Sequence, residues 1–69
     1  MATSVGRVTE ITASSDKSFE DAIKAAIARA HKTLRGVTGA WIKEQKVDLT
    51  DGVITAYRVN VLITFVVDD

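Results

Sequence analysis

Apolar and polar side chains alternate from Gly39 to Val67 in a pattern that predicts one long β-hairpin. Asp51-Gly52 lies near the middle of this segment and suits the positive φ angles of a two-residue type I′ turn. Counting outward from the turn places Trp41 opposite Leu62 on one face of the hairpin. Thr50 is expected opposite Val53 beside the turn. The other expected pairs on the face of Trp41 are Leu49 with Ile54, Val47 with Ala56, Gln45 with Arg58 and Lys43 with Asn60.

Both faces of this hairpin carry apolar side chains, while the rest of the chain predicts a single helix to cover them. A slip of one residue would exchange the two faces, so the expected surface depends on the register set by the turn. Because one helix cannot cover both faces, one face is expected to be covered by another subunit. The second face carries Ala40 with Ile63, Ile42 with Val61, Glu44 with Val59, Lys46 with Tyr57, and then Phe65 and Val67.

A strand and a helix are predicted before the hairpin, which gives an α+β fold of order β-α-β-β. The strand runs from Arg7 to Ala13. Ser18 begins the helix, because its hydroxyl can accept the free backbone N–H of Asp21. Gly36 is expected to end the helix in the left-handed conformation. The helix has a narrow, alanine-rich apolar stripe, expected to pack on the sheet, of Phe19, Ile23, Ala26, Ile27, Ala30 and Leu34.

The size and composition of the chain favour an assembled protein. We expect residues 1–69 to form one domain, which is short enough to be marginally stable alone. No cysteine is available for a disulfide, so association of identical subunits is the remaining route to stability. Nine basic and nine acidic side chains balance, which argues against a nucleic-acid partner. No membrane span or signal peptide is evident, so we expect no membrane partner and a cytoplasmic location.

The element order, the stretch SDKSFEDA at residues 15–22, the Asp51-Gly52 turn and Phe65 in the last strand together resemble the dodecin family. The resemblance spans nearly the whole chain. It implies a three-stranded antiparallel sheet partly wrapped round one helix and assembled into a hollow dodecamer. For flavin-binding members of the family, the resemblance implies that isoalloxazine rings stack in pairs between tryptophans near two-fold axes. A glutamine of the last strand hydrogen-bonds the ring, and these members store or buffer flavin without turnover.

Two residues depart from that flavin-binding pattern. Counting outward from Asp51-Gly52, Gly39 occupies the position of the stacking tryptophan, and Arg58 occupies the position of the ring-binding glutamine. Trp41 lies on the same face as Gly39 but about 6.6 Å further along the strand. We therefore expect weak or absent flavin binding in the usual arrangement. A flavin-free branch of the family, including members that bind calcium instead, fits this pattern better.

Each candidate ligand-binding residue has a simpler structural role as an alternative. Trp41 either forms an aromatic surface for a flat ligand or anchors a subunit interface. Gln45 beside Arg58 either holds a carbonyl-rich ring or a phosphate, or makes a solvated cross-strand pair or an intersubunit salt bridge. Because no acid is expected to face Arg58 within the chain, its partner should be a bound anion or an acid of another subunit. The candidate acids are Glu10, Glu44 and Asp48.

The remaining polar residues define no catalytic or metal centre. His31 has no nucleophile partner in sight, and no phosphate-binding loop or nucleophile turn is present, so an enzyme is not expected. Two functions remain: a shell that sequesters a small ligand, for which FMN or riboflavin are candidates, and a structural or calcium-binding shell. No EF-hand spacing is present, and the metal ligands stay undetermined. The acids that can serve calcium are Glu44, Asp48, Asp51, Asp68 and Asp69.

Overall fold

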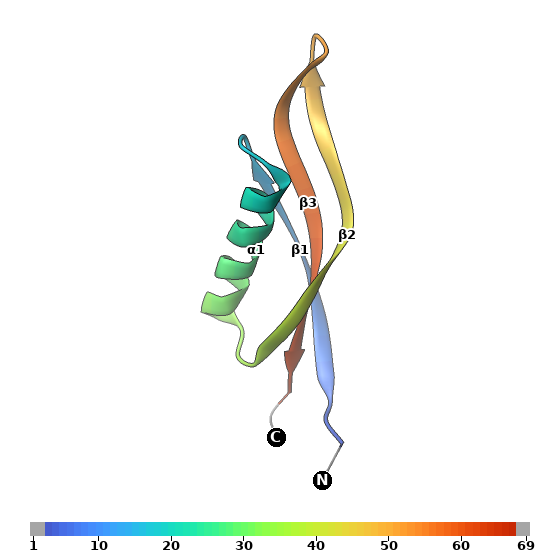
Figure 1. The fold of residues 1–69 in the computed structure, drawn as a ribbon. Helices are drawn as coiled ribbons and strands as arrows, with labels where there is room; N and C mark the ends of the chain where they lie inside the picture. The colour runs from blue at the N-terminus through green and yellow to red at the C-terminus, as the bar shows by residue number, and fades with distance from the viewer. Residues whose placement is uncertain (1–2, 68–69) are drawn as a thin grey trace.

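A three-stranded antiparallel sheet and one helix make up the fold in the computed structural model, which describes residues 3–67. The strand order in the sheet is β1-β3-β2, and β3 pairs antiparallel with both neighbours (Figure 1). This confirms the predicted β-α-β-β order. The elements are β1 (Gly6–Ser15), α1 (Phe19–Thr33), β2 (Val37–Thr50) and β3 (Val53–Val66).

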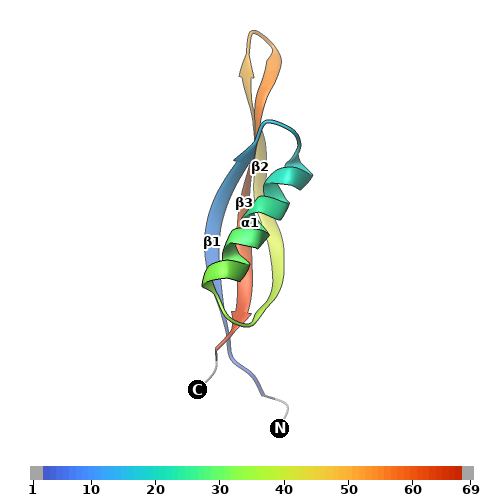
Figure 2. The same ribbon diagram turned by 90° about the vertical axis from the view of Figure 1, so that its left-hand side faces the viewer.

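The helix lies along one face of the sheet and covers only part of its length. It packs mainly on β1 and β3 and touches β2 less. The end of the β2–β3 hairpin extends well beyond the start of the helix (Figures 1 and 2). Both residues of the turn, Asp51 and Gly52, have positive φ, at 52° and 78°, as predicted for a two-residue turn. The hairpin therefore forms a projecting arm that α1 does not reach.

The helix begins at the predicted N-cap, Ser18, but ends at Leu34 and not at Gly36 as expected. Ser18 is the N-cap, and its hydroxyl accepts the Asp21 backbone N–H at 3.0 Å, as predicted. The Asp21 carboxylate accepts a hydrogen bond from the Ser15 hydroxyl at 2.6 Å and so ties the helix to the end of β1. Leu34, in extended backbone, caps the other end. Gly36 has a φ of 70°, and its carbonyl accepts the Val66 N–H at 3.0 Å, so it shapes the entry into β2.

The core is formed where α1 faces the central strand. Small alanine side chains let the helix lie close to the sheet. The predicted stripe is right for Ala26 and Ala30 but omitted Ala22, which is fully buried. Ile27 was expected in the stripe, yet it is 39% exposed because it lies about 100° round the helix from Ala26. The buried residues are Ala22, Ala26, Ala30, Val59, Val61 and Ile63, with Ile11, Ala13, Phe19, Ile23, Leu34 and Val37 packed around them.

The predicted register is correct at both ends of the hairpin and wrong in its middle. Leu49 pairs with Ile54, and Trp41 pairs with Leu62, as expected. Between them, two register shifts offset the pairing by one residue. Thr55 has no partner on β2, and Lys43 has none on β3, so the two extra residues cancel. The pairs in between are Asp48 with Ala56, Val47 with Tyr57, Lys46 with Arg58, Gln45 with Val59 and Glu44 with Asn60.

Candidate functional site

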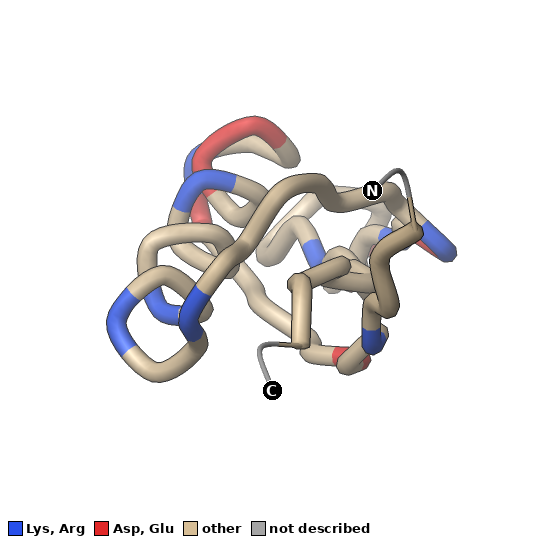
Figure 3. Tube along the Cα trace, turned by 90° about the horizontal axis from the view of Figure 1, so that it is seen from below, with Lys and Arg blue, Asp and Glu red and all other residues tan. Residues whose placement is uncertain are grey.

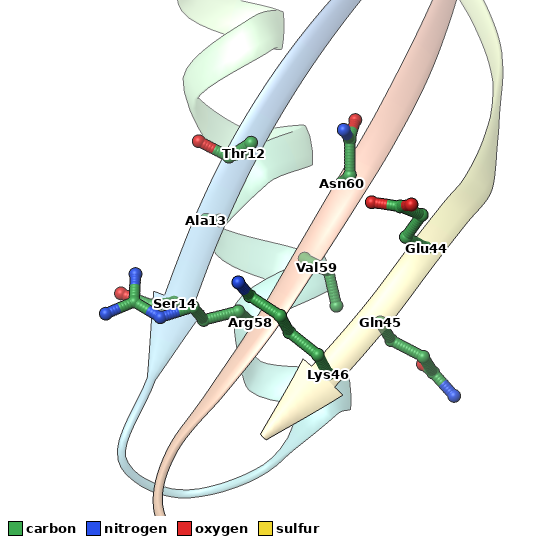
Figure 4. A pocket seen from close by; sticks show the side chains of 9 residues that line it. All are labelled: Thr12, Ala13, Ser14, Glu44, Gln45, Lys46, Arg58, Val59 and Asn60. Carbon is green, nitrogen blue, oxygen red and sulfur yellow. The ribbon is translucent and has the colours of Figure 1, made fainter. Parts of the chain in front are cut away.

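The face of the sheet that points away from α1, here called the outer face, carries the polar residues of the candidate site. Val59, Val61 and Ile63 point into the core, so the residues that alternate with them on β3 point outward. A pocket of about 450 Å³ lies across all three strands (Figure 4). Its lining residues are Thr12, Ala13 and Ser14 from β1, Glu44, Gln45 and Lys46 from β2, and Arg58, Val59 and Asn60 from β3.

Two rows of outer-face residues cross this pocket. One row contains Thr12, Asn60 and Glu44, and the next row towards the turn contains Ser14, Arg58 and Lys46. The first row offers oxygen acceptors, and the second offers two cationic donors beside a hydroxyl. The pocket therefore presents a change of charge within two residues along the strands.

Arg58 lines the pocket, and its partner differs from the prediction. Its Nε donates to Oδ2 of Asp48 in the same chain at 2.8 Å, and both side chains are about half exposed. The expectation that no acid of the same chain would reach Arg58 is wrong. The unpaired Thr55 moves Asp48 opposite Ala56, next to Arg58 along the neighbouring strand.

Lys46 stands directly opposite Arg58, where the sequence predicted Gln45. Like charges in opposite positions of neighbouring strands repel each other. Among residues 3–67, the ion pairs involve other bases, and Lys46 has none. Gln45 instead faces Val59, and Figure 4 shows its side chain directed away from Arg58. Sequence reasoning missed Lys46 because nothing in the local sequence marks the two bulges.

A second network joins all three strands beside the pocket. Glu10 Oε2 accepts from Asn60 Nδ2 at 2.6 Å and lies 3.4 Å from Lys43 Nζ. The Asn60 hydrogen bond, followed by the Lys43 charge, lowers the pKa of Glu10 below its ordinary value. Asn60 Oδ1 is buried and has no hydrogen-bond partner within the described part of the chain. Glu44 extends towards Asn60 from β2 (Figure 4).

Trp41 and Gly39 lie on the outer face but do not line the pocket. Trp41 is 49% exposed and stands opposite Leu62. Gly39 stands opposite Thr64, and a Cβ added to it would meet nothing within 4 Å. The structure therefore brings Arg58 and Gln45 to the pocket and leaves an open strip of surface beside Trp41.

No metal centre is assembled within residues 3–67, where no three or more His, Cys, Asp and Glu side chains come together. Glu44 faces Asn60, Asp48 holds Arg58, and Asp51 is exposed in the turn. Asp68 and Asp69 lie outside the described residues. His31 is exposed on α1. None of the helical segments described is long and apolar enough to cross a membrane.

A family model and the most similar solved structures both indicate the same family. The Dodecin family model matches residues 5–68. A dodecin from Streptomyces coelicolor is 25% identical, with a TM-score of 0.90, and the match covers 100% of this chain and 99% of that one. A variant of the Thermus thermophilus dodecin is 30% identical, with a TM-score of 0.90 and coverage of 97% and 100%.

A third similar structure is described as a calcium-chelating antigen, calcium dodecin, from Mycobacterium tuberculosis. It is 29% identical, with a TM-score of 0.79, and the match covers 94% of this chain and 93% of that one. The comparison with curated protein sequences gives no match.

Proposed function

Because the chain belongs to the dodecin family, we propose that it forms a non-enzymatic shell of identical subunits that holds a small ligand in the outer-face pocket. Dodecins are non-enzymatic binding proteins, and they form homo-oligomers. For this chain we propose a dodecamer in the cytoplasm, with residues 1–69 as the single domain of each subunit. The ligand is sequestered rather than converted.

The small core supports the assembly. Within residues 3–67 six residues are buried, and three of them are alanines, so burial stabilises the isolated subunit only modestly. Large apolar side chains remain exposed in the single subunit. Their cover in a homo-oligomer would supply the missing burial. These exposed residues are Val5, Val8, Ile27, Trp41, Ile42, Leu49, Val53 and Ile54.

The observation that carries the ligand proposal is the opposition of Lys46 and Arg58 at the pocket. The two positive charges repel each other, and Asp48 compensates only the charge of Arg58. A ligand with a carboxylate, a phosphate or several carbonyl oxygens would relieve the rest, since both side chains donate only. We therefore propose that Arg58 binds the ligand together with Lys46, that Gln45 contributes at the rim, and that Trp41 beside Gly39 offers an adjoining stacking surface.

This arrangement differs from the flavin site that the family resemblance implies. In this chain Gly39 stands at the position of the stacking tryptophan, and Arg58 stands at the position of the ring-binding glutamine. We expect riboflavin and FMN to bind weakly or not at all in the usual paired stack. Titration of either flavin with the purified protein, followed by flavin fluorescence, tests this directly. Complete quenching with submicromolar affinity would overturn the expectation, and a flavin would then be the ligand.

Calcium binding is a second candidate, favoured by the similarity to the calcium dodecin. The described residues bring no three acids together in one subunit, so a calcium ion would need carboxylates from several subunits. Among the acids of the hairpin, Glu44 and Asp51 form no ion pair with another residue of the range 3–67. Isothermal titration of the assembled protein with calcium distinguishes the two candidates. Heat of binding that disappears in Glu44→Gln would support the calcium site.

A further inference from the structure

A second pocket, of about 320 Å³ and here called the terminal pocket, lies at the end of the sheet where β1 begins and β3 ends (Figure 1). It is lined by Phe65, Val66 and Val67 at the end of β3 and by two arginines, Arg7 and Arg35. None of its lining residues belongs to the outer-face pocket. The terminal pocket therefore combines an apolar floor with two cationic side chains, and no acid is among its lining residues.

The pairing of β1 with β3 places Arg7 in this pocket. Arg7 stands opposite Phe65. The Val67 N–H donates to the Val5 carbonyl at 2.9 Å, so the backbone pairing continues past the end of β3. Because Phe65 lies two residues after the buried Ile63, both Phe65 and Arg7 are on the helix side of the sheet. Arg7 is thus held on the same side of the sheet as the end of α1.

The left-handed turn after α1 places Arg35 in the same pocket. Gly36 has a φ of 70°, and its carbonyl accepts the Val66 N–H at 3.0 Å, so the turn is joined directly to β3. A Cβ at position 36 would lie 3.2 Å from the Val66 carbonyl oxygen, so only glycine fits this close approach without strain. Arg35 immediately precedes the contact and is exposed. Backbone hydrogen bonds on two separate segments therefore hold the two arginines around one pocket before any ligand binds.

Neither arginine has an ion pair within residues 3–67, where the ion pairs involve three other bases. Residues 22–43 contain no acid, so none accompanies Arg35 along the chain. Glu10 is the acid nearest to Arg7 in the sequence, but it projects to the outer face and pairs with Lys43. Figure 3 views the molecule from this end and shows further Lys and Arg positions around the helix. An anion in the terminal pocket would therefore meet two guanidinium groups that no other side chain of residues 3–67 neutralises.

We propose that Arg7 and Arg35 bind the phosphate of a phosphate monoester, whose apolar part packs on Phe65 and the two valines of the terminal pocket. Arginine presents planar pairs of N–H donors that match the oxygens of a phosphate. A phosphate monoester carries a charge of about −1.5 to −2 at neutral pH and three acceptor oxygens, so it suits two guanidinium groups better than a carboxylate does. Inorganic phosphate would leave the apolar floor uncovered. This site is separate from the outer-face pocket and does not depend on the ligand proposed there.

Isothermal titration of the assembled protein with phenyl phosphate tests the site, and an Arg58→Leu background removes the contribution of the outer-face pocket. In this background we expect one phenyl phosphate bound per subunit. Further replacement Arg7→Leu or Arg35→Leu should weaken binding about tenfold or more, because each removes charge-assisted hydrogen bonds. Arg29→Leu in the same background is the matched control and should leave the affinity unchanged, since Arg29 is an exposed arginine of α1 outside the pocket lining.

Three other outcomes would overturn the site. Complete loss of binding in Arg58→Leu places the phosphate in the outer-face pocket and leaves the proposed function standing. Equal affinity for phenol shows that the phosphate is not recognised. Binding that appears only after Asp68→Asn and Asp69→Asn shows that acids of the chain itself occupy the pocket. A second measurement uses the wild type and does not depend on how the leucine variants fold. The methyl NMR signals of Val66 and Val67 should shift on titration with phenyl phosphate, and unchanged signals also overturn the site.

Discussion

Asp48 and Arg58 of the same chain form an ion pair, with 2.8 Å between Oδ2 and Nε, although the simplest hairpin register would keep them apart. The unpaired Thr55 supplies the extra residue that brings them together. Both side chains are about half exposed, so the pair contributes only about 0.2–1 kcal/mol to stability. Its main effect is to fix the direction of the guanidinium at the pocket.

Replacement of Arg58 by leucine should preserve the subunit fold and remove anion binding at the outer-face pocket. The side chain is half exposed and contributes little to the core, whereas its guanidinium is the fixed donor of the pocket. Circular dichroism and isothermal titration with small carboxylates and phosphates check the two parts. Lys17→Leu, which removes a charge outside the pocket lining, serves as the control and should bind as wild type. Equal binding by both variants would contradict the role given to Arg58.

A charge at Leu62 should dissociate the assembly. Leu62 lies between Glu10 and Trp41 on the outer face, where a neighbouring subunit is expected to cover the apolar side chains. An aspartate buried there without a partner costs more than the contact contributes. Native mass spectrometry of Leu62→Asp should show smaller species, while Leu62→Met, which keeps the volume and polarity, should show the full assembly. An intact assembly of the aspartate variant would place the interface elsewhere.

Acid should remove the contribution of Glu10 to stability. Its pKa is lowered from 4.5 in the fold, so the ionised form is favoured in the native state. The stabilisation is present above 4.5 and is lost as the pH falls through the lower folded value. The difference in melting temperature between wild type and Glu10→Gln should therefore be largest at neutral pH and narrow on acidification. A difference that stays constant over that range would show that the carboxylate charge is not responsible.

Two glycines should respond differently to alanine. Gly36 has a φ of 70°, and an added Cβ would lie 3.2 Å from the carbonyl oxygen of Val66. Gly36→Ala should therefore lose about 1–2 kcal/mol from the left-handed backbone alone. At Gly39 the added Cβ meets nothing, so Gly39→Ala is the matched control and should change stability by about 0.5 kcal/mol or less. Thermal denaturation of the two variants makes the comparison.

The open surface at Gly39 also allows a gain of binding to be tested. Because nothing lies within 4 Å of an added Cβ, a tryptophan can start from this position without a backbone clash. Gly39→Trp combined with Arg58→Gln should raise flavin affinity above that of wild type, since it restores the two residues that the family resemblance implies. Flavin fluorescence quenching is the measurement, with Gly39→Ala and Arg58→Gln as the control. No gain would show that other residues determine flavin binding here.

Local sequence signals predicted the elements of this fold well. Ser18 marked the helix start, and Asp51-Gly52 marked the turn, because each satisfies a backbone requirement within a few residues. The middle of the hairpin was not predictable in this way. Thr55 and Lys43 are ordinary strand residues, and their opposite offsets cancel, so the pairs at both ends agree with the unbroken count. The wrong partner for Arg58 and the omission of Lys46 both follow from this.

The two cancelling bulges decide which side chains of the central hairpin lie on the outer face. Regular pairing through Thr55 and Lys43, without the two bulges, would keep the partners near the turn and at Trp41 but would turn residues 44–48 of β2 over. Gln45 would then face Arg58, and Lys46 and Asp48 would leave the outer face. The same side chains can thus build a cationic or an amide-lined pocket, depending on how two residues outside the pocket lining are paired. In such a hairpin, a change of register between the two bulges can alter ligand choice as strongly as substitutions within the pocket.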